Sequence, residues 1–166
     1  MLKDFLDFGD LTMEEWENIF NLASDIYENP GKYSERCKGR ILATLFYEPS
    51  TRTQFSFQAA MMKLGGNAIG FSGTAGSSVT KGESLKDTIK IVSGYADIIA
   101  VRHYQAGAPL AASLYAGKAP VINAGDGLHL HPTQTLLDLF TIGKYKKFSG
   151  LNIGVCGDLL NGRTVQ

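Results

Sequence analysis

The chain has 166 residues, of which 44% are hydrophobic, so it matches one ordinary globular domain in size and in the apolar content that a core needs. Its 16 basic and 16 acidic residues cancel, which argues against a general attraction to nucleic acid or to a membrane surface. No apolar run approaches the ~20 residues of a membrane-spanning helix, and the N-terminus lacks the pattern of a signal peptide. We therefore expect a cytoplasmic protein that has neither nucleic acid nor a membrane as a partner.

The cysteines and histidines do not follow a metal-site pattern. Cys37 and Cys156 lie far apart and have no CxxC spacing, so we expect reduced, structural thiols and neither a disulfide framework nor a zinc site. His129 and His131 are separated by one residue and a proline follows directly, which is a poor arrangement for a metal pair. The sequence thus predicts no metal centre.

The first predicted element is an amphipathic helix that runs from Thr12 towards Tyr27. Thr12 and Glu15 have the spacing of a capping box, in which the threonine is the N-cap. Asn29-Pro30-Gly31 ends the helix, and we interpret the basic residues 32–40 as a solvated connection. Five apolar residues recur at helical spacing, which predicts that one face of the helix docks against a sheet: Trp16, Ile19, Phe20, Ala23 and Ile26.

The next segments predict a βαβ unit. Ile41–Phe46 is an apolar run typical of a strand, and residues 68–71 form a second strand after the helix-ending pair Gly65-Gly66. Residues 72–83 are small and polar without periodicity, which predicts a mobile loop. The helix between the two strands has three apolar residues on one face: Phe55, Ala59 and Met62.

The remaining pattern continues to alternate between helix and strand. We expect a helix from Ser84, a strand over 97–103, a helix over 108–116, a strand over 120–126 and a helix that begins at Pro132. Proline suits the first helical position because its φ is fixed and it has no N–H to leave unpaired. The pattern predicts a three-layer α/β fold with a four-stranded parallel sheet flanked by helices.

The last residues predict the beginning of a second unit. Residues 151–156 have the composition of another buried strand, and the sequence stops at Gln166 before a helix could cover that strand. A lone strand cannot make a domain. We therefore interpret residues 1–149 as one domain and residues 150–166 as the first strand of a second, truncated α/β domain.

A candidate phosphate site lies on the turn between the first strand and its helix. Ser50, Thr51, Arg52 and Thr53 follow the strand directly. The first turn of a helix has unpaired N–H groups and a partial positive charge, so an arginine there is unfavourable unless an anion joins it. The residues therefore favour a bound phosphate. The alternative is that Ser50 only caps the helix while Arg52 extends into solvent.

Two further segments are expected at the same rim of the sheet. Arg102 ends the third strand, and His131 and Gln134 lie at the start of the last helix. The carboxyl ends of parallel strands form the ligand crevice of such sheets, so these side chains should meet near the Ser50–Thr53 turn. The helix N-terminus should lower the pKa of His131 and keep it neutral. The alternatives are that Arg102 is a surface residue and that Gln134 closes a capping box.

Together these motifs resemble the aspartate/ornithine carbamoyltransferase family over essentially all 166 residues. The turn at Ser50–Thr53, Lys81-Gly82-Glu83, Arg102-His103, His131–Gln134 and Gly162-Arg163-Thr164 occur in the order found in its catalytic chains. Lys81 favours the aspartate branch, because a loop lysine there reaches into a neighbouring subunit's site. Gln54 departs from the family, which commonly has a second arginine at that position. We expect this departure to put in doubt a secondary ion pair at a subunit contact and not the phosphate cradle itself.

The resemblance implies transfer of the carbamoyl group of carbamoyl phosphate to L-aspartate, which gives N-carbamoyl-L-aspartate and phosphate in pyrimidine biosynthesis. It implies no covalent intermediate, metal or organic cofactor. The phosphate would be held by Ser50, Thr51, Arg52 and Thr53. The carbonyl oxygen would be stabilised by Thr53, Arg102 and His131, a role worth about 100- to 1000-fold in rate per donor. Gln134 would orient the carbamoyl nitrogen.

The same resemblance implies that one chain does not complete the site. Ser77 and Lys81 would come from the adjacent subunit, which implies a homotrimer of catalytic chains and allows for additional regulatory chains. Arg163, together with Lys81, would bind a carboxylate of aspartate.

Two other functions stay open at this point. An ornithine carbamoyltransferase would share the Ser50–Thr53 and His131-Pro132 motifs, and only Lys81 argues against it. A third hypothesis, of another class, is a non-catalytic module that binds anions or serves assembly, because a chain that ends at Gln166 lacks most contacts to aspartate.

Overall fold

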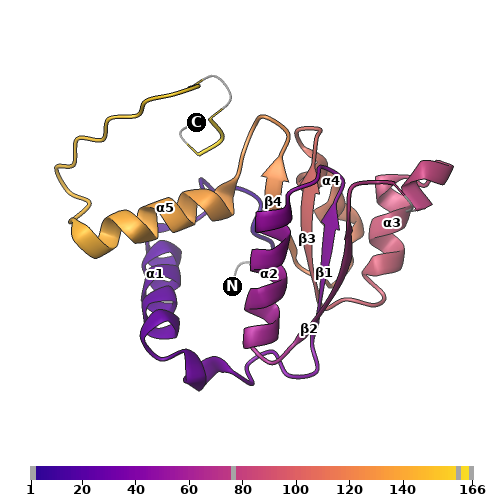
Figure 1. Ribbon diagram of the computed structural model, residues 1–166, viewed down its shortest axis with the longest axis horizontal. Helices are drawn as coiled ribbons and strands as arrows, with labels where there is room; N and C mark the ends of the chain where they lie inside the picture. Colours follow the sequence, from indigo (N-terminus) through magenta and orange to yellow (C-terminus); the bar gives the residue numbers. More distant parts are fainter. Residues whose placement is uncertain (1–2, 76–77, 160–161, 165–166) are drawn as a thin grey trace.

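The computed structural model describes residues 3–75, 78–159 and 162–164. Its centre is a parallel sheet in the order β2-β1-β3-β4 (Figure 1). The strands span Ile41–Phe46 (β1), Asn67–Ser72 (β2), Ile98–His103 (β3) and Val121–Asp126 (β4). The predicted four-stranded parallel α/β fold is therefore confirmed.

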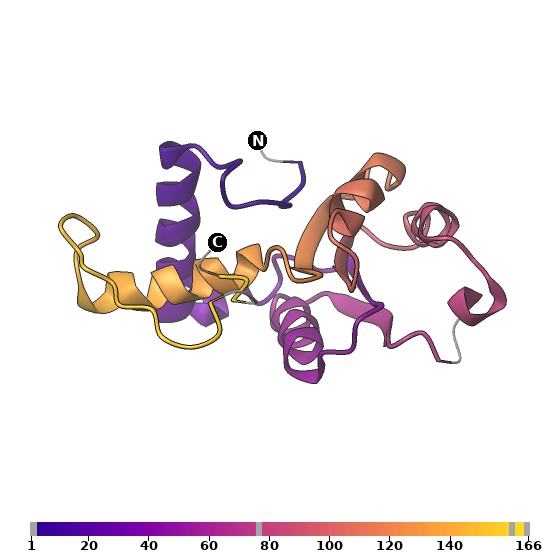
Figure 2. The same cartoon turned by 90° about the horizontal axis from the view of Figure 1, so that it is seen from above.

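Helices cover both faces of the sheet. On one face, Ala43, Leu45 and Val101 pack with Ile89 of α3 (Leu85–Val92) and Ala112 of α4 (Ala108–Tyr115). On the other face, a smaller cluster of Leu42, Phe46, Ala100 and Ala124 packs with Met61 of α2 (Thr51–Lys63). Figure 2 shows α2 and the α3/α4 pair on opposite sides of the strands.

The helix α2 turns its predicted apolar face outward. Phe55 is 61% exposed, Met62 is 58% exposed, and Ala59 between them is exposed as well. The side chains that α2 buries are Gln54 and Met61. The periodicity thus identified a real face of the helix, but within one chain that face does not pack against the sheet.

The helix α1 (Met13–Glu28) begins with the predicted capping box, in which the Glu15 N–H donates to Thr12 Oγ1 over 3.2 Å. The prediction that it docks against the sheet is wrong. None of its 16 residues, all of which the structure describes, is buried. Instead α1 packs across α5 (Pro132–Tyr145), where the rings of Phe20 and Phe140 lie 5.9 Å apart (Figure 1). The ring of Phe148, which follows α5, also lies 5.7 Å from the ring of Phe20.

Two short 3₁₀ helices complete the elements: η1 (Pro30–Tyr33) follows α1, and η2 (Ser78–Lys81) lies within the segment predicted as a loop. The next helix, α3, starts at Leu85, one residue after the predicted start, because Ser84 is its N-cap and its Oγ accepts a hydrogen bond from the Asp87 N–H. None of the helices in the described part of the chain combines the length and the hydropathy needed to cross a bilayer.

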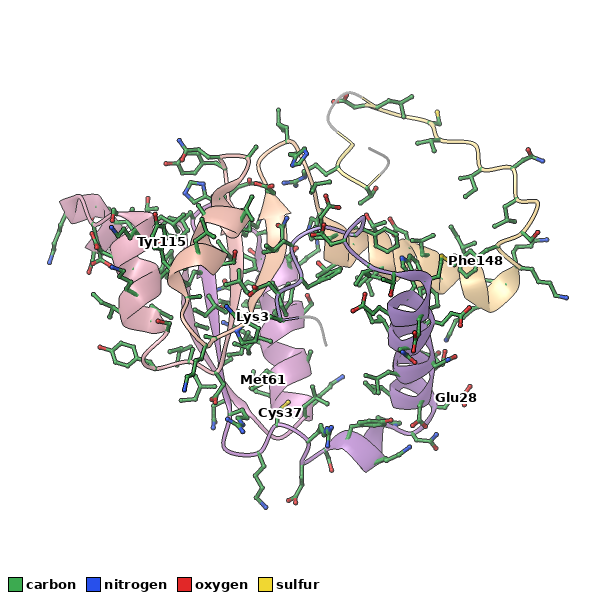
Figure 3. All side chains as sticks on the ribbon, turned by 180° about the vertical axis from the view of Figure 1, so that it is seen from behind. Lys3, Glu28, Cys37, Met61, Tyr115 and Phe148 are labelled. Atoms are coloured by element: carbon green, nitrogen blue, oxygen red, sulfur yellow. The ribbon has the colours of Figure 1, made fainter. Side chains whose placement is uncertain are left out.

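Both cysteines are free. Cys37 is half-buried and packs beside Met61 below the sheet (Figure 3), so the expectation of a structural thiol is confirmed there. Cys156 is exposed, and for it that expectation is wrong.

The predicted buried strand at residues 151–156 is wrong for this structure. These residues belong to no helix or strand, and all but the first are exposed. A strand forms only where its N–H and C=O groups find a neighbouring strand, and this segment runs apart from the sheet (Figure 1). The division of the chain at residues 149 and 150 stays a prediction.

Candidate active site

The carboxyl ends of β1 and β3 lie side by side, because Phe46 of β1 is in register with Arg102 of β3. The Tyr47 N–H donates to the Arg102 carbonyl oxygen over 2.8 Å, which continues the pairing beyond β1. The connection that leads to the Ser50–Thr53 turn therefore starts beside Arg102. Sequence reasoning predicted this neighbourhood from the parallel order of the strands.

Arg102 is a buried side chain, 5% exposed, so the alternative that it is a surface residue is wrong. Its Nη2 lies 2.5 Å from Glu48 Oε1, and its Nη1 donates to the Ala124 carbonyl oxygen over 3.3 Å. Its Nε finds no hydrogen-bond partner among the residues that the structure describes. A buried guanidinium is costly unless a carboxylate and further acceptors compensate it, and Glu48 supplies most of that compensation.

Gly125 of β4 makes room for this guanidinium. A Cβ atom at position 125 would stand 2.6 Å from Arg102 Nη1, and the φ of +134° is one that side chains other than glycine rarely adopt. The absence of a side chain therefore lets Arg102 lie flat against the end of β4.

Arg163 joins the same group of charges from the C-terminal segment. Its Nη1 donates to the Gly127 carbonyl oxygen over 2.8 Å and lies 3.7 Å from Glu48 Oε1. Glu48 thus lies between two guanidinium groups. Sequence reasoning missed Glu48. Its position between a buried strand and the phosphate turn was a signal that could have indicated a role in the site.

His131 is the backbone N-cap of α5 and is 9% exposed. Burial lowers the pKa of His131 to about 4, and the positive charges of Arg102 and Arg163 act in the same direction. The imidazole is therefore neutral near pH 7, as predicted. The physical cause differs, since burial and two arginines contribute most and the prediction named only the helix N-terminus.

The start of α2 has the free donors that the phosphate hypothesis requires. Ser50 is the backbone N-cap, but its side chain caps no helical N–H and instead donates to Thr53 Oγ1 over 3.0 Å. The alternative that Ser50 only caps the helix is therefore wrong, whereas its second part agrees with the structure, because Arg52 is exposed. Thr51 and Arg52 are exposed, and within this described helix the first turn contains no acidic residue.

Thr53 and His131 line one cavity of about 540 Å³ between α1, α2 and α5. Gln134 also lines it, but its Nε2 donates to Asp138 Oδ1 over 2.9 Å, one turn further along α5. No side chain caps α5 in this fully described helix, so the alternative of a capping box closed by Gln134 is wrong.

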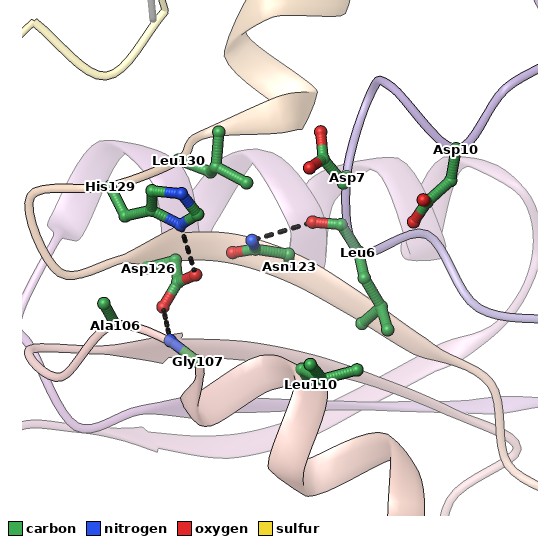
Figure 4. A pocket seen from close by; sticks show the side chains of 10 residues that line it. All are labelled: Leu6, Asp7, Asp10, Ala106, Gly107, Leu110, Asn123, Asp126, His129 and Leu130. Atoms are coloured by element: carbon green, nitrogen blue, oxygen red, sulfur yellow. Dashed lines mark hydrogen bonds and ion pairs between the residues drawn. The ribbon is translucent and has the colours of Figure 1, made fainter.

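His129 belongs to a different cavity, of about 620 Å³ (Figure 4). Its Nδ1 lies 3.3 Å from Asp126 Oδ2, while the other carboxylate oxygen accepts a hydrogen bond from the Gly107 N–H over 2.7 Å. The two neighbouring histidines therefore face separate spaces. Across the residues that the structure describes, no group of three or more potential metal ligands occurs.

Lys81 is not brought to this group within one chain. It is exposed at the end of η2, and Figures 1 and 2 both place η2 at the end of the molecule opposite α5. Ser77 lies outside the described residues. The single chain thus gathers Arg102, His131 and Arg163 around Glu48, close to the β1–α2 turn.

The chemistry of this arrangement suits a small anion. The start of α2 offers backbone N–H groups and hydroxyls, and the rim adds the buried guanidinium of Arg102, the half-buried guanidinium of Arg163 and a neutral imidazole. Donors that are fixed in a buried site stabilise a developing negative charge without reorganisation during the reaction.

Comparisons with known proteins agree with this geometry. A model of the family described as aspartate/ornithine carbamoyltransferase, carbamoyl-P binding domain, matches residues 3–144. The aspartate carbamoyltransferase catalytic subunit of Clostridium novyi (strain NT) is 59% identical over 165 residues, which are 99% of this chain and 54% of that protein. The corresponding subunit of Clostridium perfringens (strain 13 / Type A) is 59% identical over the same 99% of this chain and 53% of its own length. The chain therefore spans about half the length of the curated relatives it matches.

Solved structures share the fold. The catalytic subunit of M. jannaschii aspartate transcarbamoylase has a TM-score of 0.80 and 50% identity over 86% of this chain and 47% of that chain. Aspartate transcarbamoylase from Trypanosoma cruzi, in complex with carbamoyl aspartate and phosphate, has a TM-score of 0.89 and 37% identity over 98% of this chain and 51% of that chain. The chain belongs to the aspartate/ornithine carbamoyltransferase family, of which it contains the carbamoyl-P binding domain.

Proposed function

We propose that this chain is the carbamoyl phosphate-binding part of an enzyme that carbamoylates L-aspartate and so takes part in pyrimidine biosynthesis. The observation that carries the proposal is the meeting of Arg102, His131 and Arg163 beside the β1–α2 turn. The two clostridial relatives are named aspartate carbamoyltransferase catalytic subunits, which favours L-aspartate over ornithine as the acceptor.

The phosphate group would bind at the start of α2. Ser50, Thr51, Arg52 and Thr53 provide hydroxyls and a guanidinium, and the uncapped first turn provides N–H groups. A dianion placed there is stabilised both by the hydrogen bonds and by the helix dipole. Arg52, which is exposed in this structure, would neutralise charge on the departing oxygen.

The carbonyl oxygen of carbamoyl phosphate would face Thr53, Arg102 and His131. When the amino group of aspartate attacks the carbonyl carbon, negative charge develops on that oxygen, and donors in a buried site lower the energy of that state. Because the pKa of His131 is about 4, its imidazole is neutral near pH 7. The one N–H of the neutral ring can donate a hydrogen bond to the carbonyl oxygen. Gln134 would orient the carbamoyl nitrogen after releasing Asp138.

Arg163 would contribute to the binding of aspartate, and Glu48 would hold it in place. The 3.7 Å distance between Arg163 Nη1 and Glu48 Oε1 supports this role, because it places the guanidinium next to the proposed carbonyl site.

The remaining residues, Ser77 and Lys81, would come from a neighbouring subunit of a homotrimer. Two observations support an assembly of this kind. The short helix η2, which ends at Lys81, lies at the end of the molecule opposite α5 (Figures 1 and 2). The exposed residues Phe55, Ala59 and Met62 form an apolar face on α2, beside the edge strand β2. Regulatory chains and a cytoplasmic location stay predictions.

The test measures binding and turnover separately. The 166-residue chain should bind carbamoyl phosphate and inorganic phosphate in a calorimeter but release phosphate slowly with L-aspartate. The complete polypeptide should release phosphate rapidly with L-aspartate and not with L-ornithine as the matched control acceptor. Turnover with ornithine would favour the second hypothesis, and a chain that binds neither anion would favour the non-catalytic module.

A further inference from the structure

Gln54 stands where the family commonly has an arginine. In this chain it is buried, 8% exposed, so the expectation that the departure concerns only a contact between subunits is revised. Its Nε2 donates to Thr44 Oγ1 over 3.3 Å. Thr44 lies in the middle of β1 and is completely buried, on the face of the sheet that α2 covers. A buried hydroxyl on an apolar face needs partners, since each unpaired polar group costs free energy.

The hydroxyl of Thr44 is fully satisfied. Besides the bond from Gln54, it accepts a bond from Gln58 Nε2 over 3.1 Å and donates to the Ile69 carbonyl oxygen of β2 over 3.2 Å. A hydroxyl has one hydrogen and room for two incoming bonds, so these three contacts use its whole capacity. We refer to Thr44, Gln54 and Gln58 as the Thr44 network.

The neighbouring strand is shaped to admit this network. Gly70 lies opposite Thr44 in the register of β1 and β2. A Cβ atom at position 70 would stand 2.1 Å from the Thr44 carbonyl oxygen and 2.4 Å from Thr44 Oγ1, and the φ of Gly70 is +146°. Only glycine allows β2 to approach both the backbone and the hydroxyl of Thr44 so closely.

The position of the Thr44 network in the chain links it to the proposed phosphate site. Gln54 directly follows Thr53 and lies in the first turns of α2, while Thr44 lies two residues before the strand end that pairs with Arg102. The bond from Gln54 to Thr44 therefore joins the two ends of an eleven-residue segment that contains Glu48 and the Ser50–Thr53 turn. No side chain caps this fully described helix. The hydrogen bond from Gln54 to Thr44 therefore links its first turns to β1 and restricts the direction of its free N–H groups.

We propose that Gln54 is a positioning residue, which acts through Thr44 to hold the first turn of α2 at the place and angle at which it receives the phosphate of carbamoyl phosphate. Gln54 does not touch the ligand. The proposal rests on the proposed function, because it assumes that this turn binds an anion. A neutral amide suits the position, since Thr44 offers its donor a hydroxyl and not the carboxylate that a buried guanidinium would need.

The chain contains a matched control for this proposal. Gln58 donates to the same hydroxyl but lies one helical turn further from the Ser50–Thr53 turn. Gln54→Met and Gln58→Met each remove one hydrogen bond to Thr44 and keep the length of the side chain. A purely structural role would therefore affect both variants alike, whereas a positioning role distinguishes them.

The experiment measures the affinity of the chain for inorganic phosphate and for carbamoyl phosphate by calorimetry at one fixed salt concentration. We expect Gln54→Met to bind both anions about tenfold more weakly and Gln58→Met to bind within about twofold of the wild type. Amide hydrogen exchange without ligand gives a second readout: the N–H at position 54, which donates to the Ser50 carbonyl oxygen and closes the first turn of α2, should exchange faster in Gln54→Met and unchanged in Gln58→Met.

The outcomes separate the inference from the function on which it rests. If the wild type binds neither anion, the proposed function and the inference are both overturned. If the wild type binds and Gln54→Met binds equally well, or both variants weaken alike, only the inference is overturned. Should Gln54→Met fail to fold, Thr44→Ser and Thr44→Val replace it. Thr44→Ser keeps the hydroxyl and should bind both anions as tightly as the wild type, whereas Thr44→Val should bind them more weakly. Equal affinities in the two variants would contradict the inference.

Discussion

The predicted site residues lie in two regions that differ in burial and in partners. At the rim formed by β1, β3 and β4, Arg102 and His131 are buried, and Arg102 contacts Glu48 directly. The helix η2 lies on the side of the molecule opposite α5 (Figure 1), and Lys81 at its end is exposed.

This difference indicates how the two regions are fixed. A buried guanidinium must be compensated by groups of its own chain, so its position is determined when the chain folds. An exposed lysine in a segment of small polar residues retains many rotamers until another surface contacts it. We infer that the rim is complete in one chain, whereas Lys81 acts only where chains assemble. The predictions below test that contrast.

The largest effect is expected from Arg102→Met in the complete polypeptide. Catalytic efficiency with carbamoyl phosphate should fall by about 100- to 1000-fold, because one donor to the developing oxyanion is lost and Glu48 remains to repel the dianion. Steady-state assays of phosphate release measure this change. Arg36→Met, on an exposed arginine at the other end of the sheet, is the control. A loss of less than about tenfold for Arg102→Met would remove Arg102 from the site.

The second prediction concerns the stability of the rim below neutral pH. The pKa of His131 is about 4 in the folded chain and about 6.5 in the unfolded chain, so the unfolded state takes up its proton first as the pH falls. The free energy of unfolding should therefore decrease between about pH 6.5 and pH 4, by up to about 3 kcal/mol for this group. Urea unfolding at several pH values measures the decrease.

His131→Asn is the control for that measurement. Burial also lowers the pKa of His103, so some pH dependence should persist in the variant. The difference between the wild type and His131→Asn isolates the contribution of His131. An equally steep decrease in both proteins would show that the imidazole of His131 is already charged in the folded chain or is solvated there.

The third prediction tests the remote region. Lys81→Gln should remove most turnover from the assembled, complete polypeptide, by roughly 100-fold, because a charged donor to the reacting groups is lost. The same substitution in the 166-residue chain should leave phosphate binding unchanged while that chain is monomeric. Mixing Lys81→Gln chains with Arg102→Met chains should restore activity at sites that receive intact residues from both. Near-normal kinetics of Lys81→Gln, or no recovery in the mixture, would contradict a shared site.

Sequence reasoning located most elements because local signals mark their ends. The limits of β1 are the predicted ones, Thr12 is the expected N-cap, and α5 begins at Pro132 as predicted. Periodicity could not tell what a helical face meets. It grouped the apolar residues of α1 correctly, but the face lies towards α5 and a cavity, because packing partners depend on the whole chain.

The parts of the site that sequence reasoning missed depend on contacts between distant segments. Glu48 and Arg102 are 54 positions apart, and nothing in the spacing shows that they form an ion pair. Gln54 was recognised only as a departure from the family, while its bond to Thr44 follows from the packing of α2 on β1. Residues 151–156 have the composition of a strand, but a strand also requires an edge with which to pair.

The smallest effect in this series is expected from Gly125→Ala, which tests whether the rim depends on one close approach. The new Cβ would stand 2.6 Å from Arg102 Nη1, so the guanidinium must move, and carbamoyl phosphate should bind about threefold to tenfold more weakly.

Gly150→Ala is the matched control, since Gly150 also has a positive φ of +74° but no atom within 4 Å of the added Cβ. Both variants should lose about 1 to 2 kcal/mol of stability from backbone strain, measured by urea unfolding. Only Gly125→Ala should also lose affinity, because only that methyl group meets Arg102; equal affinities in the two variants would mean that Arg102 can move without consequence for the ligand.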